Sequence, residues 1–305
     1  MTINFEGKVA IVTGAGNGLG RSHALALAAR GAKVVINDLG GARDGSGASS
    51  LASQEVVRLI EENGGEAISH GANVANFEEV QDMVQQTIAK WGRVDILINN
   101  AGILRDKSFS KMSIDDFKLV IDVHLMGSVN CTKAVWDIMR EQNYGRIVMT
   151  TSSSGMYGNF GQSNYGAAKM AVLGLMNTLV IEGAKNNIRV NAIAPTASTR
   201  MTEDLMPEDV AKIFTSEAVS AGLMTLCDDD APNRFVLCAG AGGFSRARIF
   251  ETEGCFIPQQ SQTPEAVRAL WSELTEQEGQ TAFESGINQS EKFVKKAVTY
   301  MASQR

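Results

Sequence analysis

Three side chains that could move a proton lie close together in the middle of the chain. Tyr165 and Lys169 are four residues apart, and Ser152 lies thirteen residues before the tyrosine. A spacing of four places two side chains on one face of a helix, where an ammonium group would favour the phenolate and lower the phenol pKa. A serine hydroxyl directed at the same place would hydrogen-bond a substrate alcohol or carbonyl. The pattern predicts alcohol–ketone chemistry with Tyr165 as general acid and base.

Such a reaction also needs a hydride carrier, and the start of the chain has a pattern that could bind one. An apolar run at 8–13 is typical of a buried strand, and a glycine-rich turn and a helical stretch to Arg30 follow it. Glycines allow a tight turn in which backbone N–H groups and the helix N-terminus approach a pyrophosphate. The spacing is Gly-x3-Gly-x-Gly over 14–20, because Leu19 occupies the third glycine position of the commoner Gly-x-Gly-x-x-Gly.

A second buried strand, predicted at 32–38, ends in the carboxylate of Asp38, eighteen residues after Gly20. An acidic residue at this place binds the ribose 2′-hydroxyl of NAD. The same charge would repel the 2′-phosphate of NADP. Arg43 could contact such a phosphate, but we interpret it as a solvated arginine, since Asp38 is nearer the ribose. The sequence therefore predicts NAD as the cofactor.

Each pattern alone has an ordinary structural explanation, because glycine turns occur in many loops and a tyrosine near a lysine is commonly a packed phenol. Their order along the chain is more specific. Over residues 7 to 240 the chain resembles the short-chain dehydrogenase/reductase superfamily. The matching motifs are Thr13-Gly14-x3-Gly18-x-Gly20, Asn99-Asn-Ala-Gly102, Ser152 and Tyr165-x3-Lys169.

The resemblance implies roles for further residues. Lys169 would bond the nicotinamide ribose, the Asn73 amide would serve the adenine ring, and Ile193 would lie beside the nicotinamide. The cofactor contacts that it implies are Gly14, Gly16, Asn17, Gly18, Leu19, Gly20, Asp38, Asn73, Val74, Asn100, Ala101, Gly102, Tyr165, Lys169, Pro195 and Thr199.

Two positions depart from the superfamily pattern. His124 stands where the superfamily usually has an asparagine that holds a water beside the catalytic lysine. We include His124 with Ser152, Tyr165 and Lys169 as a candidate catalytic residue, with a histidine packed in a helix as the alternative. Thr196 replaces a frequent glycine after Pro195, which leaves the shape of that loop open.

Within the superfamily, four segments resemble the (3R)-hydroxyacyl-CoA dehydrogenase domains of peroxisomal multifunctional enzymes of type 2, also called 17β-hydroxysteroid dehydrogenases. This subgroup also carries a histidine at the position of His124. The resemblance implies that the chain interconverts (3R)-3-hydroxyacyl-CoA and 3-ketoacyl-CoA. A 17β-hydroxysteroid is the alternative substrate, because both are secondary alcohols on apolar bodies. The segments are 37–41, 123–127, 194–202 and 263–271.

A protein that binds NAD as a redox sensor or scaffold, without turnover, is an alternative from another functional class. Scaffolds of this kind usually lose the tyrosine or the lysine of the catalytic pair. Both Tyr165 and Lys169 are retained in this chain. The sequence therefore favours an enzyme.

The composition predicts a soluble enzyme. The 305 residues are 44% hydrophobic and 20% charged, with a net charge of −6, which allows a large core and disfavours nonspecific binding to nucleic acid. The four cysteines show no metal-binding or redox spacing, so no metal site is predicted. We see no signal peptide, no apolar run long enough to span a bilayer, and no peroxisomal Ser-Lys-Leu ending. These features predict a cytoplasmic, stand-alone bacterial protein with neither a nucleic-acid nor a membrane partner.

Strand and helix patterns alternate along the chain, which predicts an α/β fold: a Rossmann-type doubly wound parallel sheet of about seven strands with helices on both faces. We assign residues 1–243 to an NAD-binding catalytic domain and 244–305 to a C-terminal helical extension, with helices at 264–278 and 289–302. Long helices are expected near 113–140 and 163–185. In the family these pair across an interface, which implies a homodimer or homotetramer. The extension would pack on its own domain or a partner subunit, and either cover the acyl pocket or complete the core.

Overall fold

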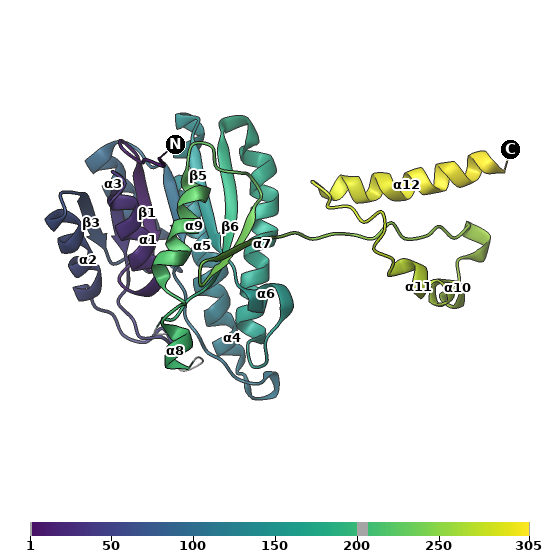
Figure 1. Cartoon of the computed structure of the whole chain (residues 1–305), viewed down its shortest axis with the longest axis horizontal. Coiled ribbons are helices and arrows are strands. Elements are labelled where there is room, and N and C mark those ends of the chain that lie inside the picture. The colour runs from purple at the N-terminus through teal and green to yellow at the C-terminus, as the bar shows by residue number, and fades with distance from the viewer. Residues whose placement is uncertain (1, 200–206, 305) are drawn as a thin grey trace. The chain divides into compact units, whose positions relative to one another are not determined.

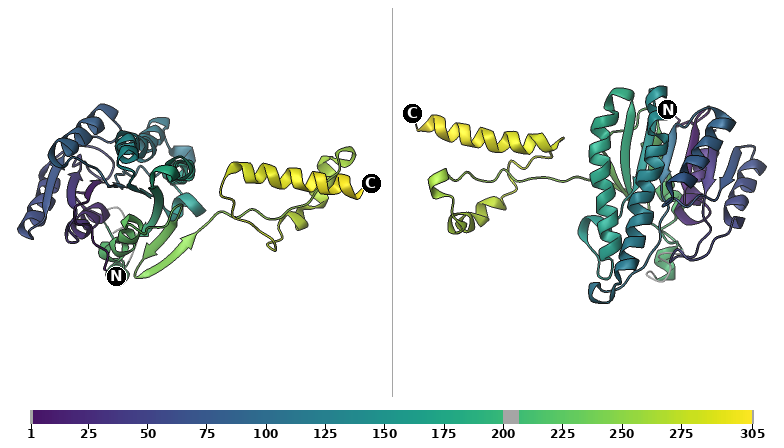
Figure 2. Two further views of the ribbon diagram at one scale, coloured as in Figure 1. Left: turned by 90° about the horizontal axis from the view of Figure 1, so that it is seen from above. Right: turned by 180° about the vertical axis from the view of Figure 1, so that it is seen from behind.

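The computed structural model describes residues 2–199 and 207–304. The larger, N-terminal part of the chain is built around a sheet with helices on both faces (Figures 1 and 2). The sheet has eight strands in the order β3-β2-β1-β4-β5-β6-β7-β8, and all neighbours from β3 to β7 are parallel. This is the strand order of a doubly wound dinucleotide-binding fold, so the predicted fold class is confirmed. The strands are β1 (Val9–Thr13), β2 (Lys33–Asn37), β3 (Glu66–His70), β4 (Ile96–Asn99), β5 (Gly145–Thr150), β6 (Ile188–Thr196), β7 (Val236–Gly240) and β8 (Gly243–Ala247).

The helices form two layers around strands that are buried on both sides. One face packs α1, α2 and α9 into a cluster of buried apolar residues with alternate residues of the central strands, while α3, α5 and α7 cover the other face (Figure 2). The helices next to the sheet are α1 (Gly18–Ala28), α2 (Leu51–Glu62), α3 (Phe77–Trp91), α4 (Ile114–Ile121), α5 (Gly127–Gln142), α6 (Ser153–Tyr157), α7 (Ser163–Gly183), α8 (Glu208–Ala211) and α9 (Ser216–Cys227).

One strand of the sheet was not predicted. β8 lies in the segment that the sequence analysis assigned to a helical extension, and it follows β7 after only two residues, Ala241 and Gly242. Both have positive φ, 49° and 77°, as in a tight hairpin turn. A two-residue connection can only join antiparallel strands, so β8 adds an antiparallel edge to the parallel sheet.

The helices differ from the predicted ranges at three places. The long helix expected near 113–140 widens into a single π-helical turn at Asp122–Met126, between α4 and α5. The helix expected at 264–278 is divided near Leu270 into α10 (Pro264–Ala269) and α11 (Trp271–Leu274). Helix α9 was not predicted. Thr215 caps it, because its side chain accepts a hydrogen bond from the main-chain N–H of Ala218.

No apolar stretch long enough to span a bilayer is expected from the sequence, and the structure corrects this. The helical segment Ser163–Asn186, which contains α7, is long and apolar enough to cross a membrane by length and composition, with a mean hydropathy of 1.3. Core helices of soluble proteins pass the same test. In the described part of this chain the segment carries two of the candidate catalytic residues, Tyr165 and Lys169.

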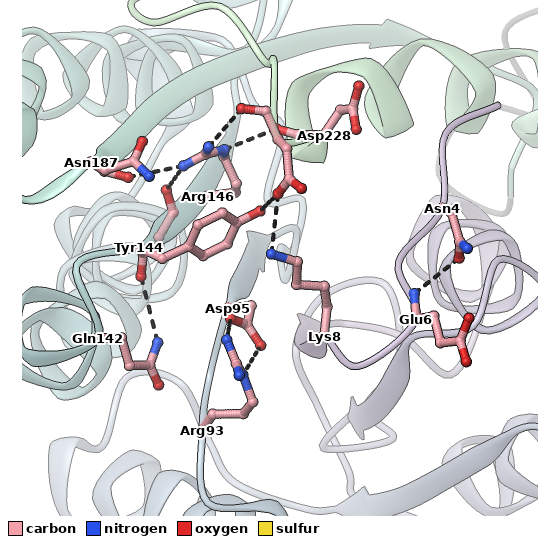
Figure 3. Close-up of polar contacts among 12 residues, drawn as sticks. Asn4, Glu6, Lys8, Arg93, Asp95, Gln142, Tyr144, Arg146, Asn187 and Asp228 are labelled. Atoms are coloured by element: carbon pink, nitrogen blue, oxygen red, sulfur yellow. Dashed lines mark hydrogen bonds and ion pairs between the residues drawn. The ribbon is translucent and has the colours of Figure 1, made fainter. Parts of the chain in front are cut away.

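A buried arginine anchors the edge of the sheet where the central strands begin (Figure 3). Arg146 in β5 is only 1% exposed. Its guanidinium group donates to main-chain carbonyl oxygens that come from three separate segments. The acceptors are Asp228 at 2.9 Å, Gly145 at 2.8 Å, Asn187 at 2.9 Å and Asp229 at 2.8 Å.

Two more side chains close this cluster. The Tyr144 hydroxyl donates to Asp229 Oδ1 at 2.7 Å, and Lys8 Nζ lies 3.1 Å from the same oxygen and 3.6 Å from the centre of the tyrosine ring (Figure 3). The cluster therefore ties β5 to the segments that precede β1 and follow α9. It lies at the end of the strands opposite to the loops described below.

The chain divides into two compact units, residues 1–246 and 247–305. In the second unit, α12 (Gly286–Ser303) places Lys292 within 3.0 Å of Glu251 and Lys296 against Glu253, and Tyr300 stacks on Phe256. From the sequence, these two lysines with Arg246, Arg248 and Lys295 are expected to form a solvated basic face, with CoA phosphates as their alternative partners. How the second unit packs stays a prediction.

Candidate active site

The loops that leave the carboxyl ends of β1, β2, β4, β5 and β6 meet at one edge of the sheet, where β1 and β4 are neighbours although they are not consecutive. In a doubly wound sheet this reversal of strand order opens a crevice that binds ligands. The predicted catalytic and cofactor-binding residues belong to these loops or to the helices that follow them, except Asn73 and Val74, which follow β3, and Pro195, which lies within β6.

Ser152 reaches the site because two glycines let helices pack closely. Ser152 is the N-cap of α6, and its Oγ accepts the main-chain N–H of Ser154 at 3.2 Å. A Cβ on Gly155 would lie 2.8 Å from Lys169 Cβ, and one on Gly166 would lie 3.1 Å from the Ser154 carbonyl oxygen. The absence of these side chains lets α6 lie directly on α7, next to Lys169.

Tyr165 and Lys169 occupy the first turns of α7, as their spacing predicts. Lys169 is 4% exposed, and its Nζ donates to the Thr150 carbonyl oxygen at 2.6 Å. The Thr151 hydroxyl donates to the Lys169 carbonyl oxygen, also at 2.6 Å. The end of β5 therefore fixes both the backbone and the ammonium group of Lys169, 5.6 Å from the centre of the Tyr165 ring.

The pKa values at this site are set mainly by burial. Burial lowers the pKa of Lys169 to about 7. Burial also raises the pKa of Tyr165, and a hydrogen bond with Ser152 opposes this rise. The structure therefore differs from the expectation that Lys169 lowers the Tyr165 pKa, because loss of water around the phenol is the main effect and the charge of Asp106 acts in the same direction. Ser152 is instead the residue that favours the phenolate.

His124 lies in the π-helical turn, almost fully buried beneath the tyrosine. Its ring meets the Tyr165 ring edge-on, with 5.2 Å between centroids. Its Nε2 is 2.8 Å from the Ile103 carbonyl oxygen and 3.1 Å from the Ile103 nitrogen, while its buried Nδ1 has no hydrogen-bond partner within residues 2–199 and 207–304. The closer carbonyl favours a proton on Nε2, which leaves Nδ1 as a free acceptor.

Gly102 makes room for this imidazole. A Cβ on Gly102 would overlap the His124 ring and would lie 3.0 Å from its Nδ1. Burial lowers the pKa of His124 to about 3, and the charge of Lys169 acts in the same direction. His124 is therefore neutral at physiological pH. It supports Ile103 and Tyr165 and presents one acceptor nitrogen towards the buried site.

The glycine turn after β1 is shaped to take a dinucleotide. A Cβ on Gly20 would overlap the Gly14 carbonyl oxygen, and one on Gly14 would lie 2.8 Å from Ala101 Cα. Asn100 braces the turn by donating from Nδ2 to the carbonyl oxygens of Thr13 at 2.9 Å and Gly14 at 3.1 Å. The backbone of the turn is thus held open at the N-terminus of α1, as pyrophosphate binding requires.

Asp38 stands at the far end of this turn. Its Oδ2 accepts the Gly16 N–H at 2.7 Å, and its Oδ1 accepts the Gly40 N–H at 2.6 Å. A carboxylate oxygen has more than one lone pair, so both oxygens can still accept from ribose hydroxyls. The residues present therefore fit NAD: glycines that would clash if they carried a side chain, and a carboxylate at the ribose position.

A cavity of about 300 Å³ joins most of the predicted cofactor contacts. Four predicted contacts do not line it: Gly16, whose N–H donates to Asp38, and the residues Tyr165, Lys169 and Pro195. Arg200 to Thr202, the end of the motif at 194–202, lie outside the described residues. The predicted residues in the cavity wall are Gly14, Asn17, Gly18, Leu19, Gly20, Asp38, Asn73, Val74, Asn100, Ala101, Gly102 and Thr199.

Other residues that line this cavity were not predicted as cofactor contacts. They come from the loop after β2, the segment after β4 and the end of α4. The loop had a visible signal, since four glycines between 40 and 47 allow it to fold back over β2. The apolar wall of α4 had none, because helical periodicity does not tell which face meets a ligand. The missed residues include Asn37, Gly41, Arg43, Gly45, Ile103, Leu119 and Val123.

Comparisons with known proteins agree with this geometry. The family model for short chain dehydrogenases matches residues 8–209. The mouse peroxisomal multifunctional enzyme type 2 is 47% identical over 278 residues, 89% of this chain, and this chain spans only 37% of that enzyme's length. A putative short-chain type dehydrogenase/reductase of Mycobacterium tuberculosis is 45% identical over 90% of this chain and 96% of its own length.

A solved structure of 7α-hydroxysteroid dehydrogenase with NADH and 7-oxo-glycochenodeoxycholic acid is also similar. It is 28% identical, with a TM-score of 0.70, over 79% of this chain and 95% of its own. The strand order, the site motifs and these matches lead to one conclusion. The chain belongs to the short-chain dehydrogenase/reductase family.

Proposed function

We propose that this protein is an NAD-dependent dehydrogenase that interconverts (3R)-3-hydroxyacyl-CoA and 3-ketoacyl-CoA. The observation that supports the reaction class is the meeting of Ser152, Tyr165 and Lys169 beside a cavity lined by a glycine turn and Asp38. The likeness to a multifunctional enzyme supports the substrate, and a neighbour solved with NADH supports the cofactor. A cytoplasmic location and a homo-oligomer stay predictions.

The side chains of this chain account for binding and proton transfer. Ser152 donates a hydrogen bond to the substrate oxygen, and the Tyr165 phenolate takes the hydroxyl proton as the alcohol becomes a ketone. Lys169, held by Thr150, lies beside the Tyr165 ring and would bond the nicotinamide ribose. NAD, when bound on the glycine turn, supplies the acceptor for the hydride that leaves C3 of the acyl chain.

The test of the substrate is a comparison of kcat/KM for NAD⁺ reduction. (3R)-3-hydroxyacyl-CoA esters of several chain lengths would be measured against the (3S) isomers and a 17β-hydroxysteroid. We expect the (3R) esters to be preferred. The steroid is the second candidate because a hydroxysteroid dehydrogenase shares the fold. A higher kcat/KM for the steroid would reverse the assignment, and turnover of either substrate would exclude a sensor or scaffold.

Cofactor choice gives a prediction at Asp38. The Asp38→Ala protein should bind NAD⁺ about ten- to a hundredfold more weakly, because charge-assisted hydrogen bonds to the ribose are lost, and its preference for NADP⁺ over NAD⁺ should rise. Isothermal titration with both dinucleotides measures this. The Asp38→Asn protein is a graded control, since it keeps the side-chain shape but loses the charge, and its single oxygen can accept from only one of the Gly16 and Gly40 amides. Wild-type preference for NADP⁺ would contradict this role of Asp38.

The two directions of the reaction should respond oppositely to pH. Alcohol oxidation needs the deprotonated phenol, and because burial raises the pKa of Tyr165, the active form accumulates on the alkaline side. Ketone reduction needs the protonated phenol and should weaken there. Profiles of kcat/KM against pH in both directions test this. Parallel profiles would show that a group other than Tyr165 controls proton transfer.

A further inference from the structure

Two loops meet across the cofactor cavity and are hydrogen-bonded to each other. The main-chain N–H of Leu104, after β4, donates to the Arg43 carbonyl oxygen at 3.0 Å. Arg105 Nε donates to the Asp44 carbonyl oxygen, also at 3.0 Å. The Ile103 side chain lies so close to Gly45 that a Cβ there would be 3.2 Å from its methyl carbons. We call residues 43–45 and 103–105 together the cofactor bridge.

The cofactor bridge forms part of the cavity wall. Arg43, Gly45 and Ile103 line the cavity together with the glycine turn and Asp38. A dinucleotide in this cavity would therefore have the glycine turn on one side and the bridge on the other. The loop that carries residues 43–45 is closed at its base, where the Ser49 N–H donates to the Leu39 carbonyl oxygen at 3.0 Å.

Arg105 connects this bridge to the catalytic end. Besides Asp44, its guanidinium group bonds Asp116 Oδ1 of α4 at 2.8 Å. Its carbonyl oxygen accepts from Asn164 Nδ2 at 3.0 Å, one residue before Tyr165. Lys107 bonds the other oxygen of Asp116 at 2.9 Å, but no hydrogen bond of Lys107 to the loop at 43–45 is present among the described residues. Arg105 and Lys107 thus share the Asp116 carboxylate. Of these two, Arg105 also bonds the loop on the other side of the cavity, at Asp44.

We propose that Arg105 is a positioning residue that fastens the cofactor bridge, and that the bridge must open for the dinucleotide to enter and leave. The hydrogen bonds from Leu104 and Arg105 end on main-chain oxygens of an exposed, glycine-rich loop, so they can break without unfolding the sheet. This inference rests on the proposed NAD function. It assigns to Arg105 a part in cofactor exchange and none in the chemical step.

The test measures the rates of NADH binding and release by stopped-flow fluorescence. Release is followed by displacing bound NADH with excess NAD⁺, and binding is followed at several NADH concentrations. In the Arg105→Ala protein both rate constants should rise about tenfold, the effect of losing one charge-assisted hydrogen bond that holds the bridge closed. The dissociation constant should change little, because a gate acts equally on entry and exit.

Lys107→Ala is the matched control, because it removes the other cation on Asp116 and leaves Arg105 in place. Its two rate constants should equal those of the wild type. Gly45→Ala is a second variant, in case Arg105→Ala lowers the unfolding temperature. Gly45 has a φ of 86°, and its new Cβ would push against Ile103. It should loosen the bridge without touching Asp116 and should accelerate both rates.

The outcomes separate this inference from the proposed function. A wild-type protein that does not bind NADH would overturn both. Tight NADH binding in the wild type with unchanged rates in Arg105→Ala and Gly45→Ala would overturn the inference alone. Faster release without faster binding would show that Arg105 contributes to NADH affinity, and would contradict a role in opening and closing the cofactor bridge. If Arg105→Ala and Lys107→Ala changed the two NADH rate constants equally, the cause would be the loss of a cation from Asp116 in α4, and the role of the cofactor bridge would be contradicted.

Discussion

The Tyr165→Phe protein is expected to lose about two to four orders of magnitude in kcat, the contribution of one positioned acid–base group. The ring should keep its place, because its edge-on contact with His124 and the helix around it involve no hydroxyl. Binding of NADH should therefore change little. Steady-state kinetics with any secondary alcohol that the wild type oxidises, together with NADH titration, measure the two effects separately.

Tyr157 offers a matched control for this substitution. It lies at the end of α6, close in sequence to the site, but its side chain is 76% exposed. Tyr157→Phe should leave kcat unchanged. If Tyr165→Phe kept activity within tenfold of the wild type, Tyr165 would not be the proton-transfer group, and Lys169 with its pKa near 7 would be the next candidate.

A large loss of stability is expected at Arg146, far from the chemistry. Arg146→Leu would remove a buried guanidinium group that donates to one buried and three partly buried carbonyl oxygens, and should lower the free energy of unfolding by about 3 to 5 kcal/mol, the usual cost of breaking a buried charged network. Urea unfolding at neutral pH measures this. The kcat/KM of the folded protein should not change, because the cluster lies at the opposite end of the strands.

The control for Arg146 is an exposed arginine on α5. Arg140 forms an ion pair with Asp137 at 3.0 Å, where both side chains are about half exposed. Arg140→Leu should change stability by less than about 1 kcal/mol, as is usual for surface pairs. Similar losses in the two variants would show that the buried carbonyl network contributes little.

The sequence predicted the parts of the fold that depend on local patterns. Strands buried on both faces form continuous apolar runs, and the turn at 14–20 needs glycines in fixed places, so both are visible in the residue order. The pairing of Tyr165 with Lys169 follows from helical spacing. These features led to the sheet, the glycine turn and the catalytic helix.

Other features depend on contacts between distant segments, which residue order does not show. Arg146 looked like the charged start of an ordinary strand, because its acceptors follow α9 and precede β6. The position of the His124 ring depends on the absence of a side chain at Gly102, 22 positions away. The turn that creates β8 has an alanine at positive φ, where sequence rules expect glycine or asparagine.

The burial of Lys169 has a thermodynamic consequence for the whole protein. Its pKa is about 7 in the folded chain but lies near 10.5 when the side chain is in water, so between these values the unfolded chain binds the extra proton. Through this linkage Lys169 makes the native state more stable as pH rises from about 7 to about 10, and it destabilises that state increasingly as pH falls through this window. The residue placed to assist proton transfer therefore weakens the fold at neutral pH, a trade of stability for activity at one position.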